Sequence, residues 1–371
     1  MPISPAMDFA MPFSGACWFD VLPRSTACPD LSPKVLLHAG PPFRGAPPAP
    51  VINSAVQALL FEGLTVDAAE ARELLLRGEV KLQPAQNHRV ATPLAQVVSS
   101  SMLMLAVEQQ GEICYAPMIE GSAPALRFGS SAPECLQRMR DVGAWVKSSV
   151  SPLVRRAPVA IDELIRTAVA AGDECHARTS VANEALVARL HGLDAGGVAR
   201  LRAMPAFVLP LLMAAASAVM RSRCCDIEAI GGNGVEFGVR RRKEGEWRQL
   251  AGQSPRGSRF DGMGALTPLA AIGDSAVIDF CGLGGQALSV APLLAAEWSA
   301  ALPGDALSRR QSVLDPRTGI VDPERILSSA LAPLINLGII DHDGTTGLIG
   351  RGFYSPPVEL FSRAAGLTQP K

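Results

Sequence analysis

Several features that would place this chain in a common class are missing from its sequence. No apolar run reaches the ~20 residues that a membrane-spanning helix needs. The longest run, 204–220, contains Pro205 and Pro210, so we expect a buried helix and no membrane contact. No cationic segment leads into an apolar core at the start, which predicts no secretory signal and a cytoplasmic protein. With 34 basic and 35 acidic side chains, the charge balance gives no footprint for nucleic acid.

Motifs for common cofactors, metals and nucleophiles are also absent. The eight cysteines lack zinc-finger spacing, and Cys224-Cys225 cannot form a C-x-x-C site. We expect reduced cysteines, and zinc would require residues that only the fold brings together. In Gly282-Leu283-Gly284-Gly285 the third glycine comes too early for a dinucleotide fingerprint, and neither a P-loop nor a G-x-S-x-G sequence occurs. We therefore predict no cofactor and no metal.

What is present predicts an α/β chain of the α+β type. At 371 residues it is long enough for two or three domains. We expect two mixed α/β domains flanking a helical layer, and a Pro-rich N-terminal arm. The predicted division is 1–50 for the arm or linker, 51–131 for an α/β domain, 132–225 for the helical domain and 226–371 for a glycine-rich α/β domain. An apolar content of 48% with few aromatics is compatible with subunit burial, and we expect a homo-oligomer.

The elements that matter below follow from local patterns. Runs 101–108 and 112–119 predict one β-hairpin, and 235–240 with 246–250 predicts another. Helices are expected over 51–63, 66–77, 287–301 and 323–337, and a short strand over 35–38. The apolar run 276–280 predicts a further strand. Residues 341–352 are expected to form a glycine-rich loop.

The densest group of polar side chains is Gly172-Asp173-Glu174-Cys175-His176-Ala177-Arg178, between two apolar segments. Gly172 suits the end of one helix, and Asp173 suits the N-cap of a second helix over 174–190. That helix would pair Glu174 with Arg178 and give its N-terminus a histidine and an arginine, as in an anion site. The simpler alternative is a charged helix cap with a salt bridge and one buried histidine.

Glycine clusters are the second notable feature. They are Gly231-Gly232-Asn233-Gly234 with Glu236, Gly273-Asp274-Ser275, and the segment around Gly284. Successive glycine amides can surround an anion, and several such loops in one chain favour convergence on a small anionic ligand. Taken singly, each cluster is more often a tight turn.

These segments, in this order, resemble the DUF1116 family, which includes the large subunit of oxamate carbamoyltransferase. The resemblance covers about 33–365. It is carried by 40–42, 88–101, 119–121, 126–129, 172–176, 231–238, 273–275, 282–285 and 347–350. It implies carbamoyl transfer between carbamoyl phosphate and an amide nitrogen of a small acceptor of the oxamate or oxalurate type, carried out with companion subunits.

Three departures from the family pattern accompany the resemblance. His176-Ala177-Arg178-Thr179 replaces a usual His-Asn-Arg-Asn, and Ala85-Gln86-Asn87-His88 replaces a Cys-His-His type of run. The N-terminal region is expected to lack most of an extra domain. Two alternatives therefore stay open, a repurposed or non-catalytic subunit and a different amide or acyl reaction on a small carboxylic acid.

Carbamoyl transfer needs donors on the phosphate, donors on the developing oxyanion and a base near the attacking nitrogen. We assign Arg178 and the amides of 231–234 to anion binding, and His176 to proton transfer or carbonyl polarisation. Asp173 or Glu174 would orient the imidazole. Further catalytic candidates are Glu120 and His88, and further substrate-binding candidates are Asn233, Glu236, Asp274, Ser275 and Gly284.

Overall fold

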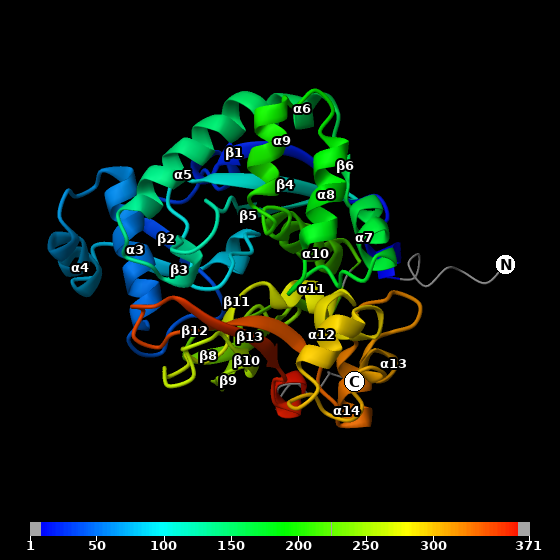
Figure 1. Ribbon diagram of the computed structural model, residues 1–371. Helices are drawn as coiled ribbons and strands as arrows, with labels where there is room; N and C mark the ends of the chain where they lie inside the picture. The colour runs from blue at the N-terminus through cyan, green and yellow to red at the C-terminus, as the bar shows by residue number, and fades with distance from the viewer. Residues whose placement is uncertain (1–8, 224, 363–371) are drawn as a thin grey trace.

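The computed structural model describes residues 9–223 and 225–362 and is shown in Figure 1. Its central element is α10 (Leu209–Ser222), which lies in the run expected as a buried helix and is buried over 210–220. It packs against β4 (Leu103–Gln109) and β5 (Glu112–Pro117), and also against β7 (Ile227–Asn233) and α11 (Ala276–Phe280). One helix thus connects the cores beneath two sheets. Within the described ranges, none of the helices has the length and apolar character needed to cross a bilayer.

The first sheet has the order β5-β4-β1-β6, with β1 at Cys17–Pro23 and β6 at Val159–Ala160. The β4–β5 hairpin confirms the first predicted hairpin. The expectation of an N-terminal arm is wrong for β1, which pairs antiparallel with β4 along most of its length. Trp18 and Val21 of β1 are buried, so their side chains fix this segment to the core although prolines follow it.

The segment after β1 contributes a two-stranded sheet and two helices. The predicted strand over 35–38 is confirmed as β2 (Val35–His38), which pairs in parallel with β3 (Lys81–Pro84). The two predicted helices are confirmed as α3 (Ala49–Glu62) and α4 (Ala68–Leu76). Gly63, with φ of 66°, ends α3, and the Asp67 carboxylate accepts from Ala69 N at the start of α4.

Helices cover the first sheet at the top of the view in Figure 1. They include α5 and α6, which a π-helical turn at Val146–Val150 connects, and the pair α7 and α8 with α9 beside it. Their bounds are α5 (Glu134–Trp145), α6 (Ser151–Arg156), α7 (Ile161–Ala170), α8 (Ser180–Arg189) and α9 (Ala195–Arg202). The short helix α2 (Arg24–Ala27) follows β1.

The C-terminal part forms two further sheets, β11-β7-β8-β9 and β10-β13-β12. Antiparallel pairing of β8 with β9 confirms the second predicted hairpin. The bounds are β8 (Glu236–Arg241), β9 (Trp247–Ala251), β10 (Arg256–Arg259), β11 (Ile272–Gly273), β12 (Ile335–Ile340), β13 (Leu348–Tyr354), α12 (Pro292–Glu297), α13 (Arg309–Val313) and α14 (Pro323–Ser329). The mixed α/β class is therefore confirmed.

Four element predictions in this part need correction. Residues 276–280 form helix α11 instead of a strand. They pack against α10 and β12 and do not pair with a neighbouring strand in a sheet. The expected helix over 287–301 is α12 with a 3-10 turn before it. The expected helix over 323–337 ends at Ser329, where Ala330 takes a φ of 56°, and Ile335 already belongs to β12. The expected loop over 341–352 contains most of β13.

Candidate functional site

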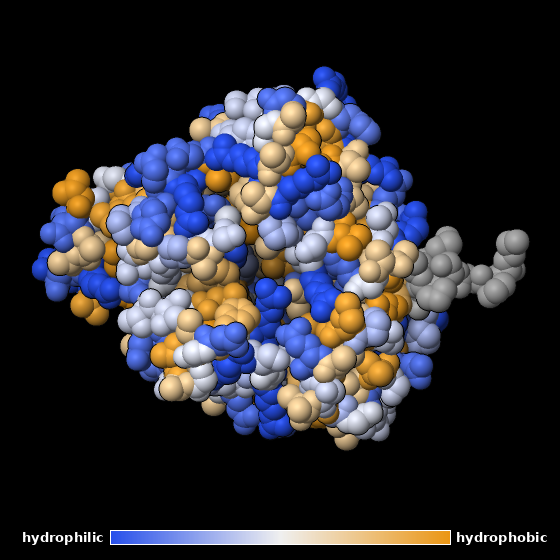
Figure 2. Space-filling view, viewed as in Figure 1, coloured by the Kyte–Doolittle hydropathy of each residue, from blue (hydrophilic) through white to orange (hydrophobic). Residues whose placement is uncertain are grey.

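A cavity of about 370 Å³ lies between the segment that follows β5, the helices α8 and α10, and the strands β12 and β13. Figure 2 shows the face of Figure 1 hollowed near its middle, between the part that carries α8 and α9 and the part that carries β12 and β13. The polar and charged lining residues are Ser122, Arg127, His176, Arg178, Thr179, Ser180, Ser275, Asn336 and Arg351. The apolar lining includes Leu94, Ile119, Phe128, Met204, Leu209, Leu337 and Leu348. Of the predicted site residues, the fold brings His176, Arg178 and Ser275 to this cavity.

His176 is held by a buried carboxylate. Its Nδ1 lies 2.8 Å from Oδ2 of Asp279, on α11, and both side chains are almost entirely buried. The second oxygen of Asp279 accepts from Gly285 N at 2.7 Å and Asn336 N at 3.0 Å. The carboxylate therefore has a fixed orientation. The Nδ1 atom of the imidazole bonds to this carboxylate, and its Nε2 atom makes no hydrogen bond within the described chain. Asp279, and not Asp173 or Glu174, orients the imidazole.

Glu174 organises the loop that carries His176. Its carboxylate accepts from His176 N at 2.8 Å, from Ala177 N at 2.6 Å and from Arg178 N at 3.2 Å. Asn336 Nδ2 adds a donor at 3.0 Å. Because these amides point at one side chain, residues 174–179 form a loop and not the first turns of a helix. The predicted helix over 174–190 is α8, which begins at Ser180, and the predicted Glu174–Arg178 side-chain pair does not form.

Asp173 caps α8 from a distance. Its Oδ2 accepts from Val181 N at 2.9 Å and Ala182 N at 3.2 Å, and its Oδ1 accepts from Cys175 N at 2.9 Å. The capping role predicted for Asp173 is thus present, although the helix starts seven residues later. Gly172 has a φ of 83° and follows the end of α7, as predicted. Asp173 and Glu174 therefore shape the loop without lining the cavity.

The ionisable groups around this loop have shifted pKa values. Burial raises the pKa of Glu174 to about 7, although the N–H donors act in the opposite direction. Burial also raises the pKa of Asp173. For His176 burial lowers the pKa, but the charge and hydrogen bond of Asp279, with a contribution from Glu174, outweigh it and raise the pKa overall. A buried histidine that a carboxylate holds in a fixed orientation suits proton transfer.

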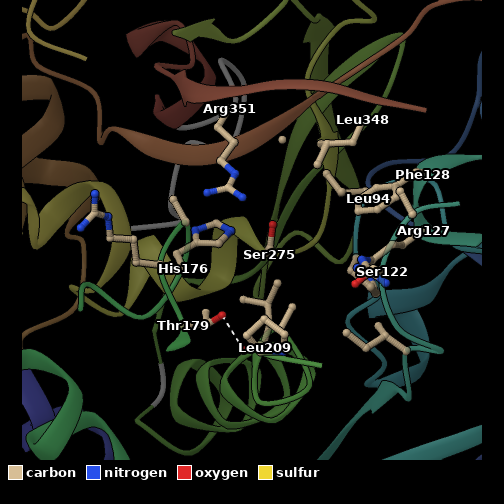
Figure 3. Close-up of a pocket in the computed structure, with 18 of the residues that line it drawn as sticks. Leu94, Ser122, Arg127, Phe128, His176, Thr179, Leu209, Ser275, Leu348 and Arg351 are labelled. Carbon is tan, nitrogen blue, oxygen red and sulfur yellow. Dashed lines mark hydrogen bonds between the residues drawn. The ribbon is translucent and has the colours of Figure 1, made fainter. Parts of the chain in front are cut away.

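Three arginines line the cavity without forming an ion pair within the described residues. The guanidinium groups of Arg127, Arg178 and Arg351 make no ion pair or hydrogen bond within the described residues. Arg127 lies over the Phe128 ring at 4.3 Å, and Arg351 lies 5.7 Å from the Phe260 ring. Figure 3 shows His176 and Arg351 on one side of the cavity, Arg127 and Ser122 on the other, and Ser275 between them. Several unpaired guanidinium groups beside a histidine suit a small anion.

The other two predicted catalytic residues lie outside the lining. Glu120 is buried next to the lining residues Ile119 and Gly121, and its Oε1 accepts from Leu126 N at 2.5 Å. Burial raises its pKa, while Arg127 acts to lower it. His88 bonds to Gln83 Oε1 at 2.8 Å, and burial lowers its pKa.

The glycine cluster at the end of β7 serves close packing. A Cβ on Gly232 would lie 2.1 Å from Ala271 O, and one on Gly231 would lie 2.6 Å from Oδ1 of Asp274. Asn233 accepts from Val235 N and Glu236 N, and its amide donates to Glu236 Oε2 at 2.9 Å. Gly231 and Gly232 are thus strand residues packed closely against the segment that contains β11, and the tight turn to β8 follows at Gly234, which takes a φ of 89°. None of these residues lines the cavity.

Asp274 and Gly284 support the lining from behind. Asp274 accepts from Gly40 N at 2.8 Å, Gln86 Nε2 at 2.6 Å and Thr92 N at 2.9 Å, and burial raises its pKa to about 7. It thereby fixes the neighbouring Ser275, which does line the cavity. Gly284 donates its N–H to Glu174 O at 2.8 Å and packs directly on Asp279.

Sequence reasoning missed Asp279, Arg127, Asn336 and Arg351. The signal for Asp279 was a lone carboxylate inside the apolar run 276–280. Arg127 lies inside one of the segments that carried the family resemblance, and Arg351 follows directly after another. Asn336 gave no local signal. The described residues contain no group of three or more histidine, cysteine or carboxylate side chains arranged to hold a metal ion.

Comparison with known proteins adds the family. The model of the family described as oxamate carbamoyltransferase subunit AllG matches residues 80–275. The chain is 30% identical to oxamate carbamoyltransferase subunit AllG of Escherichia coli K12, over 94% of this chain and 92% of that protein. The uncharacterized protein YahG of the same organism is 31% identical over 91% of this chain and 79% of its own length.

A solved structure has the same fold. It is a crystal structure of a conserved protein of unknown function from Enterococcus faecalis V583, with a TM-score of 0.80 and 23% identity, and it covers 96% of this chain and 94% of that chain. At this identity the likeness concerns the fold alone. The ordered motifs, the family model and the two curated relatives agree, and the chain belongs to the family of oxamate carbamoyltransferase subunit AllG.

Proposed function

We propose that this chain is a carbamoyltransferase-like subunit that transfers a carbamoyl group between carbamoyl phosphate and a small amide of the oxamate or oxalurate type. Membership of the AllG family supports the reaction class. The observation that carries the proposal is the cavity, which is lined by His176 with its free Nε2 and by Arg178 and Arg351, whose guanidinium groups form no ion pair within the described residues. The relative is named as one subunit of oxamate carbamoyltransferase, and we expect companion subunits to complete the assembly here.

The donor would bind on the side of His176. Carbamoyl phosphate carries its negative charge on the phosphate, and an arginine fork binds phosphate oxygens through charge-assisted hydrogen bonds. Arg178 and Arg351 supply this charge, and Ser275 Oγ adds a hydroxyl that makes no hydrogen bond within the described chain. The apolar lining around them lowers the local dielectric and strengthens these contacts.

The chemical step is a substitution at the carbamoyl carbon. The amide nitrogen of the acceptor forms a bond to that carbon, the bond from the carbon to the phosphate oxygen breaks, and the nitrogen gives up one proton. Inorganic phosphate leaves with the electron pair of the broken bond. Running in reverse, phosphate attacks the same carbon of the carbamoylated amide and the amide nitrogen regains its proton.

His176 is the group that exchanges this proton. Asp279 accepts the hydrogen of Nδ1, so the free Nε2 carries the proton when the ring is charged and a lone pair when it is neutral. Because the raised pKa favours the charged ring, His176 also stabilises negative charge on the carbonyl oxygen or on the departing phosphate.

Carbamoyl phosphate labelled with ¹⁴C in the carbamoyl group tests the proposal. The purified chain, alone and with companion subunits, is incubated with the label and a panel of amides that includes oxamate. We expect label in the acceptor with the complete assembly, and a loss of roughly 100-fold or more in rate for His176→Ala. The His191→Ala variant, outside the cavity, is the matched control and should keep the rate.

Other outcomes would identify the alternatives. Product that forms without label would indicate a different amide or acyl reaction on the same acids. If no product forms with any amide, even with companion subunits present, the chain is a non-catalytic subunit. An unchanged rate in His176→Ala would remove the proton-transfer role.

A further inference from the structure

The side of the cavity that faces His176 contains an arginine whose charge is buried and unpaired. Arg127 lies in a 3-10 turn at Leu126–Phe128, lines the cavity and is 7% exposed. Its guanidinium group makes no hydrogen bond and no ion pair within the described chain, and its Nη1 is fully buried without a partner. A buried charge is stable only when a counter-charge and hydrogen-bond acceptors accompany it.

The one carboxylate that interacts electrostatically with Arg127 among the described residues does not meet this need. Glu120 interacts electrostatically with Arg127, but the two side chains form no ion pair, and Oε1 of Glu120 is taken by Leu126 N. The second nearby cation, Arg138, donates to Ser122 O and so holds the loop. Arg127 therefore keeps its donors for a ligand in the cavity.

The orientation of Arg127 is fixed in advance. The guanidinium group lies over the Phe128 ring at 4.3 Å, and its own backbone oxygen accepts from Ala95 N at 2.9 Å. A planar fork held against an aromatic ring presents two parallel N–H donors, which match the two oxygens of a carboxylate. Figure 3 shows Arg127 across the cavity from His176 and Arg351, with Ser275 between the two sides.

We infer that Arg127 is the receptor for the carboxylate of the acceptor, and that the cavity has two anion subsites, one on each side. This inference rests on the proposed function and names its acceptor class, a small amide that also carries a carboxylate. The phosphate occupies the subsite of His176, Arg178 and Arg351. The acceptor carboxylate is bound by Arg127, so its amide nitrogen faces the carbamoyl carbon between the subsites.

Calorimetric titration of the full chain with oxamate and with oxamide separates this inference from the proposed function, since binding requires no chemistry. Oxamide has the same planar skeleton, with a neutral amide in place of the carboxylate. We expect the wild type to prefer oxamate, and Arg127→Gln to bind oxamate about 10- to 100-fold more weakly with oxamide unchanged. Arg127→Lys should recover part of the affinity, because it keeps the charge and loses the fork.

Two further variants keep the result interpretable. Arg140→Gln removes an exposed arginine of α5 outside the cavity and should bind oxamate as the wild type does.

If Arg127 serves only to balance Glu120, the double variant Glu120→Gln with Arg127→Gln will fold and bind oxamate normally, and the inference is wrong. Equal affinity of the wild type for oxamate and oxamide would also overturn it. If oxamate binding depends on Arg127 but no label is transferred, the carboxylate subsite is supported and the proposed reaction is wrong.

Discussion

The Nδ1 of His176 and the Oδ2 of Asp279 lie 2.8 Å apart, although 103 positions separate the two residues in the chain. One residue belongs to a loop before α8 and the other to α11, and both are buried beside the cavity. This pair fixes the tautomer of the imidazole and gives the cavity its only oriented histidine among the described residues. The first two predictions concern this pair.

Replacing Asp279 with asparagine should lower the pKa of His176, because the negative charge that raises it is removed. The asparagine can still accept from Gly285 N and Asn336 N, so the fold should survive. We expect a roughly 100-fold loss of carbamoyl transfer and a shift of the pH–rate profile. NMR titration of the imidazole measures the pKa directly. Asp261→Asn, at an exposed position, should change neither quantity, and an unchanged His176 pKa in Asp279→Asn would contradict the assignment.

Gly284→Ala should disturb the same pair from behind. The new Cβ would lie 2.2 Å from Oδ1 of Asp279 and 3.1 Å from Cβ of His176, at a φ of 54°. We expect a loss of roughly 1–3 kcal/mol in stability, together with loss of the reaction. Gly304→Ala is the matched control, since nothing lies within 4 Å of its Cβ. Urea unfolding and the labelled assay measure both effects, and full activity in Gly284→Ala would show that the pair tolerates displacement.

Arg178→Ala should weaken binding of the phosphate group by about 2–5 kcal/mol, because its guanidinium group lines the cavity and makes no ion pair or hydrogen bond within the described chain. Titration of the protein with inorganic phosphate and with carbamoyl phosphate measures the change. Arg202→Ala removes an exposed arginine that pairs with Glu184 outside the cavity, and it should leave both affinities unchanged. Equal affinities in wild type and Arg178→Ala would remove this residue from the site.

The stability of the chain should fall as the pH rises from about 5 to about 8. Burial raises the pKa of Glu174 and of Asp274 to about 7, from ordinary values of about 4. Between those values the folded chain binds more protons than the unfolded chain, so a rising pH favours unfolding. The raised pKa of His176 acts in the same direction. Each raised carboxyl contributes on the order of 3 kcal/mol over this window.

Urea unfolding at several pH values measures this dependence. Asp274→Asn should reduce the slope because asparagine does not titrate, and it should also lower the baseline stability, since Thr92 N loses its acceptor. Asp261→Asn should keep the slope of the wild type. A stability that stays flat or increases between pH 5 and 8 would contradict the shifts.

Local patterns were sufficient for some elements and not for others. The two hairpins were predictable because alternation and a turn act within one short segment. Residues 276–280 have the β-branched composition of a strand, yet contacts with α10 and β12 decide that they are helical. The turn at Ala330 ends the predicted helix over 323–337, and a non-glycine residue with positive φ gives no signal in the sequence.

The candidate site was predictable only in part, for a related reason. His176 and Arg178 belong to a conspicuous local cluster, and both line the cavity. Glu174 belongs to the same cluster, but its role depends on backbone amides that only the folded loop directs toward it. Asp279, Arg127 and Arg351 come from distant segments, and no spacing rule connects them to His176. The glycines of 231–234 have the composition of an anion-binding loop, but close packing against Ala271 and Asp274 explains them.

The central claim is that the cavity beside His176 and Asp279 binds the phosphate of carbamoyl phosphate. A crystal structure with phosphonoacetamide, a stable analogue with a carbon bridge in place of the labile oxygen, tests it most directly. We expect the phosphonate within about 3 Å of His176 Nε2 and of the guanidinium of Arg178 or Arg351. An analogue bound elsewhere on the chain, with this cavity empty, would contradict the account.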